Sequence, residues 1–247
     1  MARARATPSF TFGDSAPRLR GWNVQPVLAP TSRRGEIHTA KPHNGCLPTC
    51  SGLVRPVLTI ASGNPNKVAE IVSMLGPLAL EVRRQPDDLD VEETGATYLE
   101  NARLKAVAAA RRTGCWSLAD DSGLEVDALG GAPGLFTARL APTDSEKIQR
   151  LLEALEGDPY RSACFRSAMV LCSPEGQCLE EAEGVCWGEL LKAPAFSGGG
   201  IESLFWVREA NCSYGELNPS QLARLGSRGK AARALAPRLR ERLGLNR

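Results

Sequence analysis

The most informative stretch of the 247-residue chain reads Leu118-Ala119-Asp120-Asp121-Ser122-Gly123-Leu124-Glu125-Val126-Asp127, followed by Gly130-Gly131-Ala132-Pro133-Gly134. The apolar run from Cys115 to Ala119 predicts a buried strand that ends at two adjacent carboxylates. Carboxylates there lose hydration, so a metal ion, a lysine or the N–H groups of a helix end must compensate them. Because ligands of open α/β sheets gather at the carboxyl ends of strands, the stretch indicates a candidate site. The alternative is an acidic turn, since Asp, Ser and Gly are ordinary turn formers.

A second polar loop follows a predicted strand nearer the N-terminus. Val57 to Ala61 is a short apolar run, and it leads into Ser62-Gly63-Asn64-Pro65-Asn66-Lys67. Helical spacing of the next apolar residues predicts a helix that ends at Gly76-Pro77, with an inner face of Val68, Ile71, Val72 and Leu75. A helix N-terminus offers N–H groups to an anion, and a bound phosphate would explain a lysine in the first turn, where cations are disfavoured. The alternative is a plain asparagine cap.

The next predicted helix carries a lysine with two possible environments. This helix runs from about Tyr98 to Arg112, after an acidic loop that contains Glu93. Asn101 and Lys105 are four residues apart and therefore share one helix face. That face is either solvated or turned inward. In the second case Lys105 would lie beside Glu93 and Asp121.

The rest of the chain alternates predicted strands with predicted helices, which favours an α/β fold. Further strands are predicted at Leu80 to Arg84, Ala163 to Cys172, Cys178 to Leu190 and Leu204 to Val207, the second and third forming a hairpin. Leu135 to Leu140 is predicted to be extended. Further helices are predicted from about Ser145 to Glu156 and, capped by Ser220, at the C-terminus.

Composition excludes several classes of protein. Apolar residues make up 43% of the chain, which suffices for the core of one large domain or two small ones. Residues 1–55 hold eight Lys/Arg and two Asp/Glu, a net charge of +6, and the remainder holds 22 and 26, a net charge of −4. A mildly acidic body argues against nucleic-acid binding. No apolar run approaches the roughly 18 residues of a membrane span.

The eight cysteines contain no CxxC pair, and both histidines lie in the N-terminal stretch. A zinc site is therefore not predicted. Several cysteines sit in apolar, strand-like runs, so buried free thiols in a reducing cytoplasm are the simplest interpretation.

Residues 1–54 lack sustained periodicity and are rich in Pro, Ser, Thr, Gly and Arg. Three interpretations stay open: a disordered or targeting extension, a start site assigned too far upstream, and a genuine flexible tail. The last two are favoured because the stretch has modest serine content and no clear amphipathic helix. We predict that one domain occupies residues 55–247 and that residues 1–54 contribute no chemistry.

Four motifs in this order resemble the inosine/xanthosine triphosphate pyrophosphatase family, which hydrolyses non-canonical purine nucleoside triphosphates. They are Ser62-Gly63-Asn64-x-x-Lys67, Glu92-Glu93-Thr94-Gly95, Glu100-Asn101-Ala102-x-x-Lys105-Ala106, and Ala119-Asp120-Asp121-Ser122-Gly123-Leu124 with Gly130-Gly131-Ala132-Pro133-Gly134 and Ala138-Arg139. Each motif alone is weak. Together, from Val57 to about Leu155, they are highly specific.

The resemblance implies a two-lobed α/β fold with a long mixed central sheet, flanking helices and a substrate cleft between the lobes. It also implies a homodimer that hydrolyses ITP, dITP or XTP to the monophosphate and pyrophosphate with Mg²⁺. The implied metal ligands are Glu93, Asp120 and Asp121, with Asp121 also activating the attacking water. The implied substrate contacts are Ser62, Gly63, Asn64, Pro65, Asn66, Lys67, Lys105 and Ser122.

The C-terminal half departs from the family pattern. The family has a Gly-Gly-Phe-Gly-Tyr-Asp-Pro loop, with an aromatic residue that stacks on the purine, where this chain has Ser197 to Ser203. Glu202 stands in for the family's aspartate. The family's Ser-His-Arg element becomes Gly226-Ser227-Arg228, so only Arg228 survives as a substrate contact. Phe196 and Trp206 are candidate replacement rings, although such aromatics are more often core residues.

Three functional hypotheses follow. The leading one is an Mg²⁺-dependent pyrophosphatase of this family with a divergent base pocket. The second is a non-catalytic or weakly active relative that binds nucleotide, which the missing aromatic and histidine favour. The third is a related pyrophosphatase that acts on modified pyrimidine nucleotides, and the Asp-Asp-Ser-Gly context argues against it.

Overall fold

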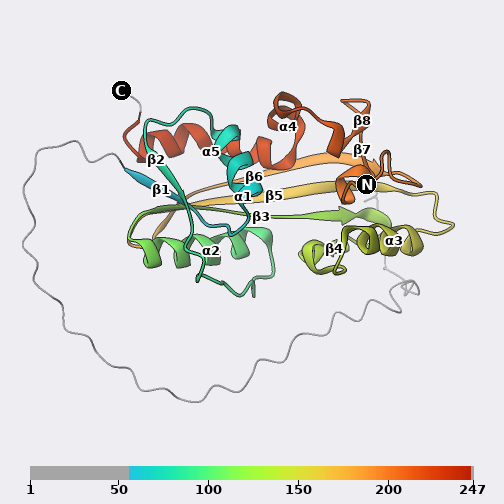
Figure 1. Cartoon of the computed structure of the whole chain (residues 1–247), viewed down its shortest axis with the longest axis horizontal. Coiled ribbons are helices and arrows are strands. Elements are labelled where there is room, and N and C mark those ends of the chain that lie inside the picture. The colour runs from blue at the N-terminus through green and yellow to red at the C-terminus, as the bar shows by residue number, and fades with distance from the viewer. Residues whose placement is uncertain (1–55, 246–247) are drawn as a thin grey trace, which may run out of the picture. The chain divides into compact units, whose positions relative to one another are not determined.

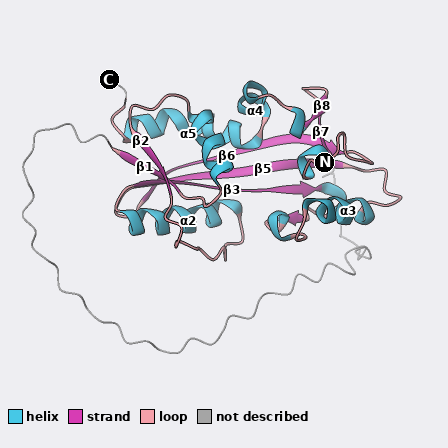
Figure 2. Ribbon diagram, viewed as in Figure 1, coloured by secondary structure: helices cyan, strands magenta, loops and turns pink. Residues whose placement is uncertain are grey.

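The computed structural model describes residues 56–245, so the interpretations of residues 1–54 lie outside the described residues. The strands are β1 Val57–Ile60, β2 Glu81–Arg84, β3 Trp116–Val126, β4 Pro133–Gly134, β5 Ser162–Cys172, β6 Cys178–Leu190, β7 Phe205–Val207 and β8 Cys212–Ser213 (Figure 1). The α-helices are α1 Pro65–Leu75, α2 Tyr98–Thr113, α3 Asp144–Ala154, α4 Pro219–Leu225 and α5 Ser227–Arg242 (Figure 2). Short 3₁₀ turns are η1 Asp127–Leu129, η2 Thr137–Arg139, η3 Ile201–Ser203 and η4 Tyr214–Glu216.

All eight described strands belong to one mixed sheet in the order β2-β1-β3-β5-β6-β7-β8, with β4 paired to β3. The pairs β1–β2 and β1–β3 are parallel, and the remaining pairs are antiparallel. The predicted hairpin is confirmed, because β5 and β6 pair along almost their whole length. The predicted α/β class, with a long mixed sheet and flanking helices, is confirmed as well.

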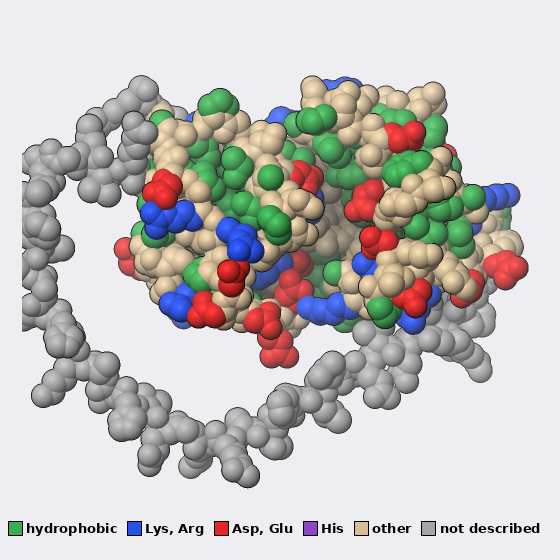
Figure 3. All heavy atoms as spheres, viewed as in Figure 1, with side chains coloured by type: hydrophobic (Ala, Val, Ile, Leu, Met, Phe, Trp, Pro, Cys, Tyr) green, Lys and Arg blue, Asp and Glu red, His purple; other side chains and the backbone are tan. Residues whose placement is uncertain are grey.

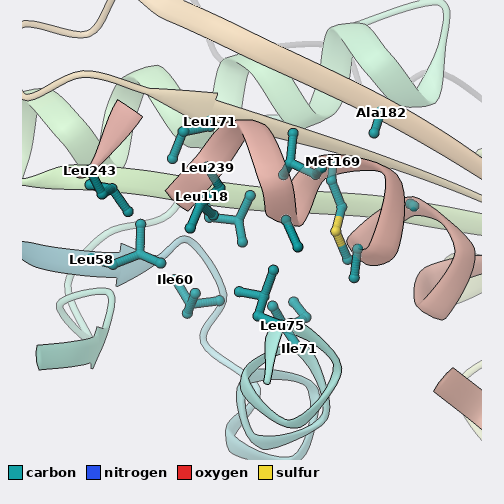
Figure 4. Packing of buried hydrophobic residues seen from close by; sticks show 14 residues of the cluster. Leu58, Ile60, Ile71, Leu75, Leu118, Met169, Leu171, Ala182, Leu239 and Leu243 are labelled. Atoms are coloured by element: carbon teal, nitrogen blue, oxygen red, sulfur yellow. The ribbon is translucent and has the colours of Figure 1, made fainter. Parts of the chain in front are cut away.

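Helices cover both faces of the sheet (Figure 1). On one face, α1 and α5 pack over a cluster of aliphatic side chains that includes Leu58, Leu118 and Leu235 (Figure 4). On the other face, α2 packs its alanines over Ala119 and neighbouring residues. Leu118 and Ala119 are adjacent in β3 and belong to different clusters, as the two-residue period of a strand requires.

Local capping interactions begin and end the helices near the site. Asn64 caps α1, since its side chain accepts hydrogen bonds from the backbone N–H groups of Asn66 and Lys67. Thr97 caps α2 by accepting from Glu100 N. Gly114 ends α2 in the left-handed conformation at φ 64°, which a glycine adopts without a steric cost.

One prediction about β3 is wrong. The strand does not end at Asp120 but continues to Val126. Tertiary pairing is the reason, because β5 pairs with every residue of β3 from Ser117 to Val126. This long ladder overrides the turn preference of Asp, Ser and Gly.

Two further predictions need correction. Leu135 to Leu140 is not extended but contains the 3₁₀ turn η2. The C-terminal helix is not continuous and is not capped by Ser220: Asn218 caps α4, and a new helix begins after Gly226. Gly226 is extended between the two helices, and α5 then lies close to β6, since a Cβ on Gly184 would lie 2.1 Å from Ser227 O.

The described cysteines are free thiols. Of the four predicted to be buried, Cys164, Cys172 and Cys186 are buried and Cys115 is half-buried. Burial raises the pKa of the Cys186 thiol to about 11, so the thiol stays protonated at neutral pH. No helix within residues 56–245 is long and apolar enough to cross a membrane.

Candidate active site

The site lies at an uncovered edge of β3. The ladder with β1 reaches only to Leu118, and the short pairing with β4 begins at Leu124. Between these two residues, on this side, β3 has no strand partner among the described residues. Lys67 from the first turn of α1 fills part of the gap, because its Nζ donates to Asp120 O at 3.0 Å. Because no strand covers this edge, side chains from both faces of β3 are accessible beside it.

Asp120 is the centre of the first cluster, on the α1 and α5 face. Its Oδ2 lies 2.7 Å from Lys67 Nζ and 3.1 Å from Arg228 Nε. Arg228 also donates to Glu70 Oε2 at 2.6 Å and to Ser122 Oγ at 3.0 Å. One guanidinium at the start of α5 therefore ties α1 to β3.

The environment of Asp120 favours its charged form. Its side chain is 0% exposed, and burial by itself would raise the pKa. The opposite charges of Lys67 and Arg228 and their hydrogen bonds outweigh burial and lower the pKa from 3.8 to about 2.

The lowered pKa predicts how stability depends on acid. A carboxylate with a depressed folded pKa stabilises the fold above its unfolded pKa, and the stabilisation is lost as pH falls through the folded pKa. Between about pH 4 and pH 2, wild-type protein should therefore lose roughly 2 kcal/mol of unfolding free energy through Asp120. Urea denaturation at stepped pH values measures this slope. Asp120→Asn should show a slope that is smaller by one titrating group, and an equal slope in both proteins would contradict the assignment.

Lys105 is the centre of the second cluster, on the α2 face. Its Nζ lies 2.8 Å from Glu93 Oε1 and 2.7 Å from Asp121 Oδ1. Asn101, one turn earlier on α2, donates to Asp121 Oδ2 at 3.3 Å. Lys105 thus points inward, as one of the two alternatives predicted, and does not lie on a solvated helix face.

The second cluster keeps its groups charged. Burial lowers the pKa of Lys105, but Asp121 and Glu93 outweigh it and leave the pKa raised. Burial raises the pKa of Glu93, but Lys105 and Arg139 outweigh it and leave the pKa lowered. Arg139 of η2 reaches Glu93 Oε2 at 2.7 Å. The role of Arg139 was missed from the sequence, although it lies within one of the quoted motifs.

The two adjacent aspartates point to opposite faces of the sheet. Asp120 faces Lys67 and Arg228, and Asp121 faces Lys105. The structure thus brings Glu93 and Asp121 together around one nitrogen and places Asp120 in the other cluster. Of the three predicted metal ligands, only Glu93 and Asp121 share a cation here.

This arrangement fits a magnesium ion that completes its shell with substrate. Among the described residues, no group of three His, Cys, Asp or Glu side chains is placed to hold a metal. Glu93 and Asp121, however, already share the ammonium of Lys105, so their oxygens lie within reach of one cation. Mg²⁺ characteristically takes one or two protein carboxylates together with phosphate oxygens and water.

A cleft of about 360 Å³ opens beside the clusters. Its lining includes Asn64, Ser122, Arg228, Lys147 and Glu202. Figure 3 shows a hollow near the middle of the visible face, with acidic and basic side chains along its margin.

The other predicted phosphate-loop residues lie around the N-terminus of α1. Ser62 Oγ accepts from Asn64 N at 3.2 Å, and Gly63 O accepts from Arg84 at 2.9 Å. Pro65 is the first residue of α1, and Asn66 N donates to the Asn64 side chain. The loop is therefore ordered by its own hydrogen bonds, and its exposed face borders the cleft through Asn64.

The aromatic side chains that line the cleft differ from the sequence-based expectation. They are Phe165 and Tyr214, whereas Phe196 and Trp206 do not line it. Phe196 instead packs on the glycine loop, where a Cβ on Gly199 would lie 2.5 Å from its ring. Neither Phe165 nor Tyr214 carried a sequence signal, because only the fold brings β5 and η4 together.

The position of the family's histidine is occupied by a hydroxyl pair. Ser227 Oγ lies 2.9 Å from Ser167 Oγ, and both side chains are buried. Ser227 therefore binds within the protein, beside Arg228 at the start of α5.

The fold and the site together define an α/β protein whose site combines clustered cationic side chains with paired carboxylates. The chain belongs to the Ham1 family, whose model matches residues 58–238. The resemblance drawn from the four motifs is thereby confirmed.

The similarity extends over nearly the whole length of each related protein. A dITP/XTP pyrophosphatase of Parasynechococcus marenigrum is 45% identical over 187 residues, covering 75% of this chain and 96% of the relative. One from Gloeobacter violaceus is 47% identical over 179 residues, covering 72% and 91%. The structure of a HAM1 protein from Coxiella burnetii matches with a TM-score of 0.69 at 38% identity, covering 75% of this chain and 99% of that one.

Proposed function

We propose that this chain is a nucleoside triphosphate pyrophosphatase that uses Mg²⁺ to hydrolyse dITP, XTP and ITP to the monophosphate and pyrophosphate. The supporting observation is Lys105, whose Nζ joins Glu93 and Asp121 beside the cluster of Asp120, Lys67 and Arg228. Relatives that cover three quarters of the chain carry the name dITP/XTP pyrophosphatase. Residues 55–247 form the proposed catalytic domain, and the proposed active form is a cytoplasmic homodimer.

The triphosphate lies along the uncovered edge of β3 in this proposal. Lys67 and Arg228 on one face and Lys105 on the other supply positive charge to phosphate oxygens. Lysine acts as a point charge on phosphate, and the arginine fork offers two parallel donors. Ser62 to Asn66 add the helix N-terminus of α1, where an anion is favoured. Ser122 contacts the substrate beside Arg228.

Asp121 accepts a proton from the attacking water. The water oxygen forms a bond to the α-phosphorus while the bond between the α-phosphorus and the bridging oxygen breaks, and pyrophosphate leaves. Asn101 and Lys105 hold the two carboxylate oxygens of Asp121, which fixes the orientation of the base. Positive side chains around the phosphates stabilise the charge that develops on the phosphoryl oxygens.

Glu93 and Asp121 are the residues that would hold Mg²⁺, with substrate oxygens completing its shell. The bound ion would neutralise phosphate charge and help orient the triphosphate. Asp120 belongs to the other cluster, on the opposite face of β3. Its contribution in this structure is to hold Lys67 and Arg228.

A substrate panel tests the proposal. Purified full chain should release pyrophosphate from ITP, dITP and XTP with Mg²⁺, and removal of the ion with EDTA should lower the rate at least about 100-fold. Restoring Mg²⁺ should restore the rate. Equal rates of pyrophosphate release with and without Mg²⁺ would contradict the proposed role of the metal.

The second candidate is a nucleotide-binding relative without turnover. The observation in its favour is the Ser227–Ser167 pair in place of the family's histidine, together with a glycine loop that packs against the exposed ring of Phe196. Calorimetry that detects ITP binding to a protein unable to release pyrophosphate would support this candidate over the first.

A further inference from the structure

The β5–β6 hairpin closes on two cysteines that face each other across the strands. Cys172 is the last residue of β5, and Cys178 is the first residue of β6. A one-residue register shift after Leu171 brings Cys172 opposite Cys178 rather than Leu179. Both cysteines also belong to the apolar cluster beneath α2. The two thiols therefore lie on one face of the sheet, as directly opposed cross-strand residues do.

The hairpin turn determines how closely the two cysteines approach. Ser173 N donates to Gln177 O at 2.8 Å, and Gly176 N donates to Ser173 O at 2.8 Å. Gly176 has φ 81°, the left-handed conformation that completes a three-residue hairpin loop. Since Ser173 and Gln177 occupy a hydrogen-bonded position, the next pair, Cys172 and Cys178, is non-hydrogen-bonded. The Cα atoms of such a pair approach to about 4.5 Å, within the range that a disulfide spans.

The two thiols already interact in the reduced protein. Burial raises the pKa of the Cys172 thiol, and a hydrogen bond with Cys178 raises it further. Packing against α2 holds the turn in this position, because a Cβ on Gly176 would lie 3.0 Å from Arg111 Nε. Cys178 is half-buried and Cys172 is fully buried, so a small oxidant reaches Cys178 first.

We propose that Cys172 and Cys178 form a dithiol that hydrogen peroxide converts into a disulfide. The thiolate sulfur of Cys178 attacks one peroxide oxygen, so an S–O bond forms, the O–O bond breaks and hydroxide leaves, which a proton converts to water. The sulfur of Cys172 then attacks the resulting sulfenic acid. The S–S bond forms, the S–O bond breaks, and the departing hydroxide takes the proton of Cys172 as water. The two thiols lose two electrons and the peroxide gains them.

The dithiol is separate from the candidate active site. Cys172 pairs with Ser117, which precedes Asp121 by four residues on β3. The new bond lies within one hairpin, so no helix or strand has to move past another. A small dithiol reverses the oxidation by thiol–disulfide exchange. This modification site therefore goes beyond the proposed function and does not depend on it.

Peptide mapping of the oxidised full chain tests the proposal. Reduced protein is titrated with hydrogen peroxide until the first cysteine within residues 56–245 loses its thiol, and the remaining thiols are alkylated in denaturant. Both cysteines lie in one tryptic peptide, residues 167–192, which also holds Cys186 as an internal reference. We expect Cys172 and Cys178 to lose alkylation together, at least about 10-fold faster than the buried Cys186. Cleavage after Glu175 should leave two fragments joined by a disulfide, and dithiothreitol should separate them.

Two controls distinguish a pair from thiols that are oxidised independently. Cys212 is also half-buried, but its cross-strand partner is Val207, so it should keep its thiol when the pair is lost. In Cys178→Ser, Cys172 should remain fully alkylatable after the same treatment.

Three results overturn the proposal. The first is loss of another cysteine of residues 56–245 before the pair. The second is a Cys178 that becomes sulfinic acid or bonds to a different cysteine while Cys172 stays reduced. The third is loss of the Cys172 thiol in Cys178→Ser at the wild-type rate. Each result leaves the proposed function standing, because the measurement does not use nucleotide hydrolysis.

Discussion

Asp121→Asn should lower kcat for ITP hydrolysis by about 10³-fold with little change in the fold. The amide cannot accept the proton of the attacking water at neutral pH, so the base is lost. Its oxygen can still accept from Lys105, whose other partner Glu93 is untouched. The structure of the cluster should therefore survive. Single-turnover measurement of pyrophosphate release at saturating ITP and Mg²⁺ gives the rate directly.

A substitution at a second carboxylate distinguishes loss of the catalytic base from the general effect of losing one negative charge. Asp88 lies in the loop before Glu93, is 66% exposed and pairs with Arg112. Asp88→Asn removes the same charge and should leave kcat within about 2-fold of wild type. If Asp121→Asn kept kcat within 10-fold of wild type while remaining folded, another group would have to be the base.

Arg228→Met should destabilise the protein by about 3 kcal/mol. The substitution removes contacts to Asp120, Glu70 and Ser122 and leaves the fully buried Asp120 with Lys67 alone. Removing one partner of a buried ion pair costs more than the pair contributes, because the remaining charge stays desolvated. The midpoint and slope of urea denaturation at pH 7 give the change in unfolding free energy.

A double-mutant cycle identifies the cause of that loss. Asp120→Asn removes the stranded charge, so the double variant with Arg228→Met should be more stable than additivity of the two single variants predicts, by about 1–3 kcal/mol. Arg238→Met is the control, since Arg238 is 47% exposed and contacts Glu180 at 3.4 Å. It should cost less than about 1 kcal/mol. Strict additivity in the cycle would contradict an energetic link between Arg228 and Asp120.

Features that depend on neighbouring residues could be predicted from the sequence. The caps at Asn64 and Thr97 follow from side chains that bond to backbone groups two or three residues away. The left-handed stop at Gly114 is equally local. The strands β5 and β6 were predicted because long apolar runs around Pro174 to Gly176 are typical of a hairpin.

Features that depend on distant partners were missed or left open. Asp120 and Asp121 were predicted to share a site at a strand end, but the ladder with β5 extends β3 through them and alternation separates their side chains. Whether Lys105 faced solvent or the site could not be settled from its helix alone. The role of Arg139 with Glu93 required η2 to fold back across the chain.

By itself the sequence determined the α/β class and the family, and it predicted the two lysines, the carboxylate ligands and the divergent base pocket. Only the tertiary structure decided that Asp120 belongs with Arg228, which is 108 residues away, and that Asp121 belongs with Lys105. It also decided that Lys147 and Glu202 line the same cleft. Helix caps and turns are bonded within a few residues, so sequence spacing encodes them. An ion pair across a sheet depends on strand register and helix placement, which the packing of the whole domain determines.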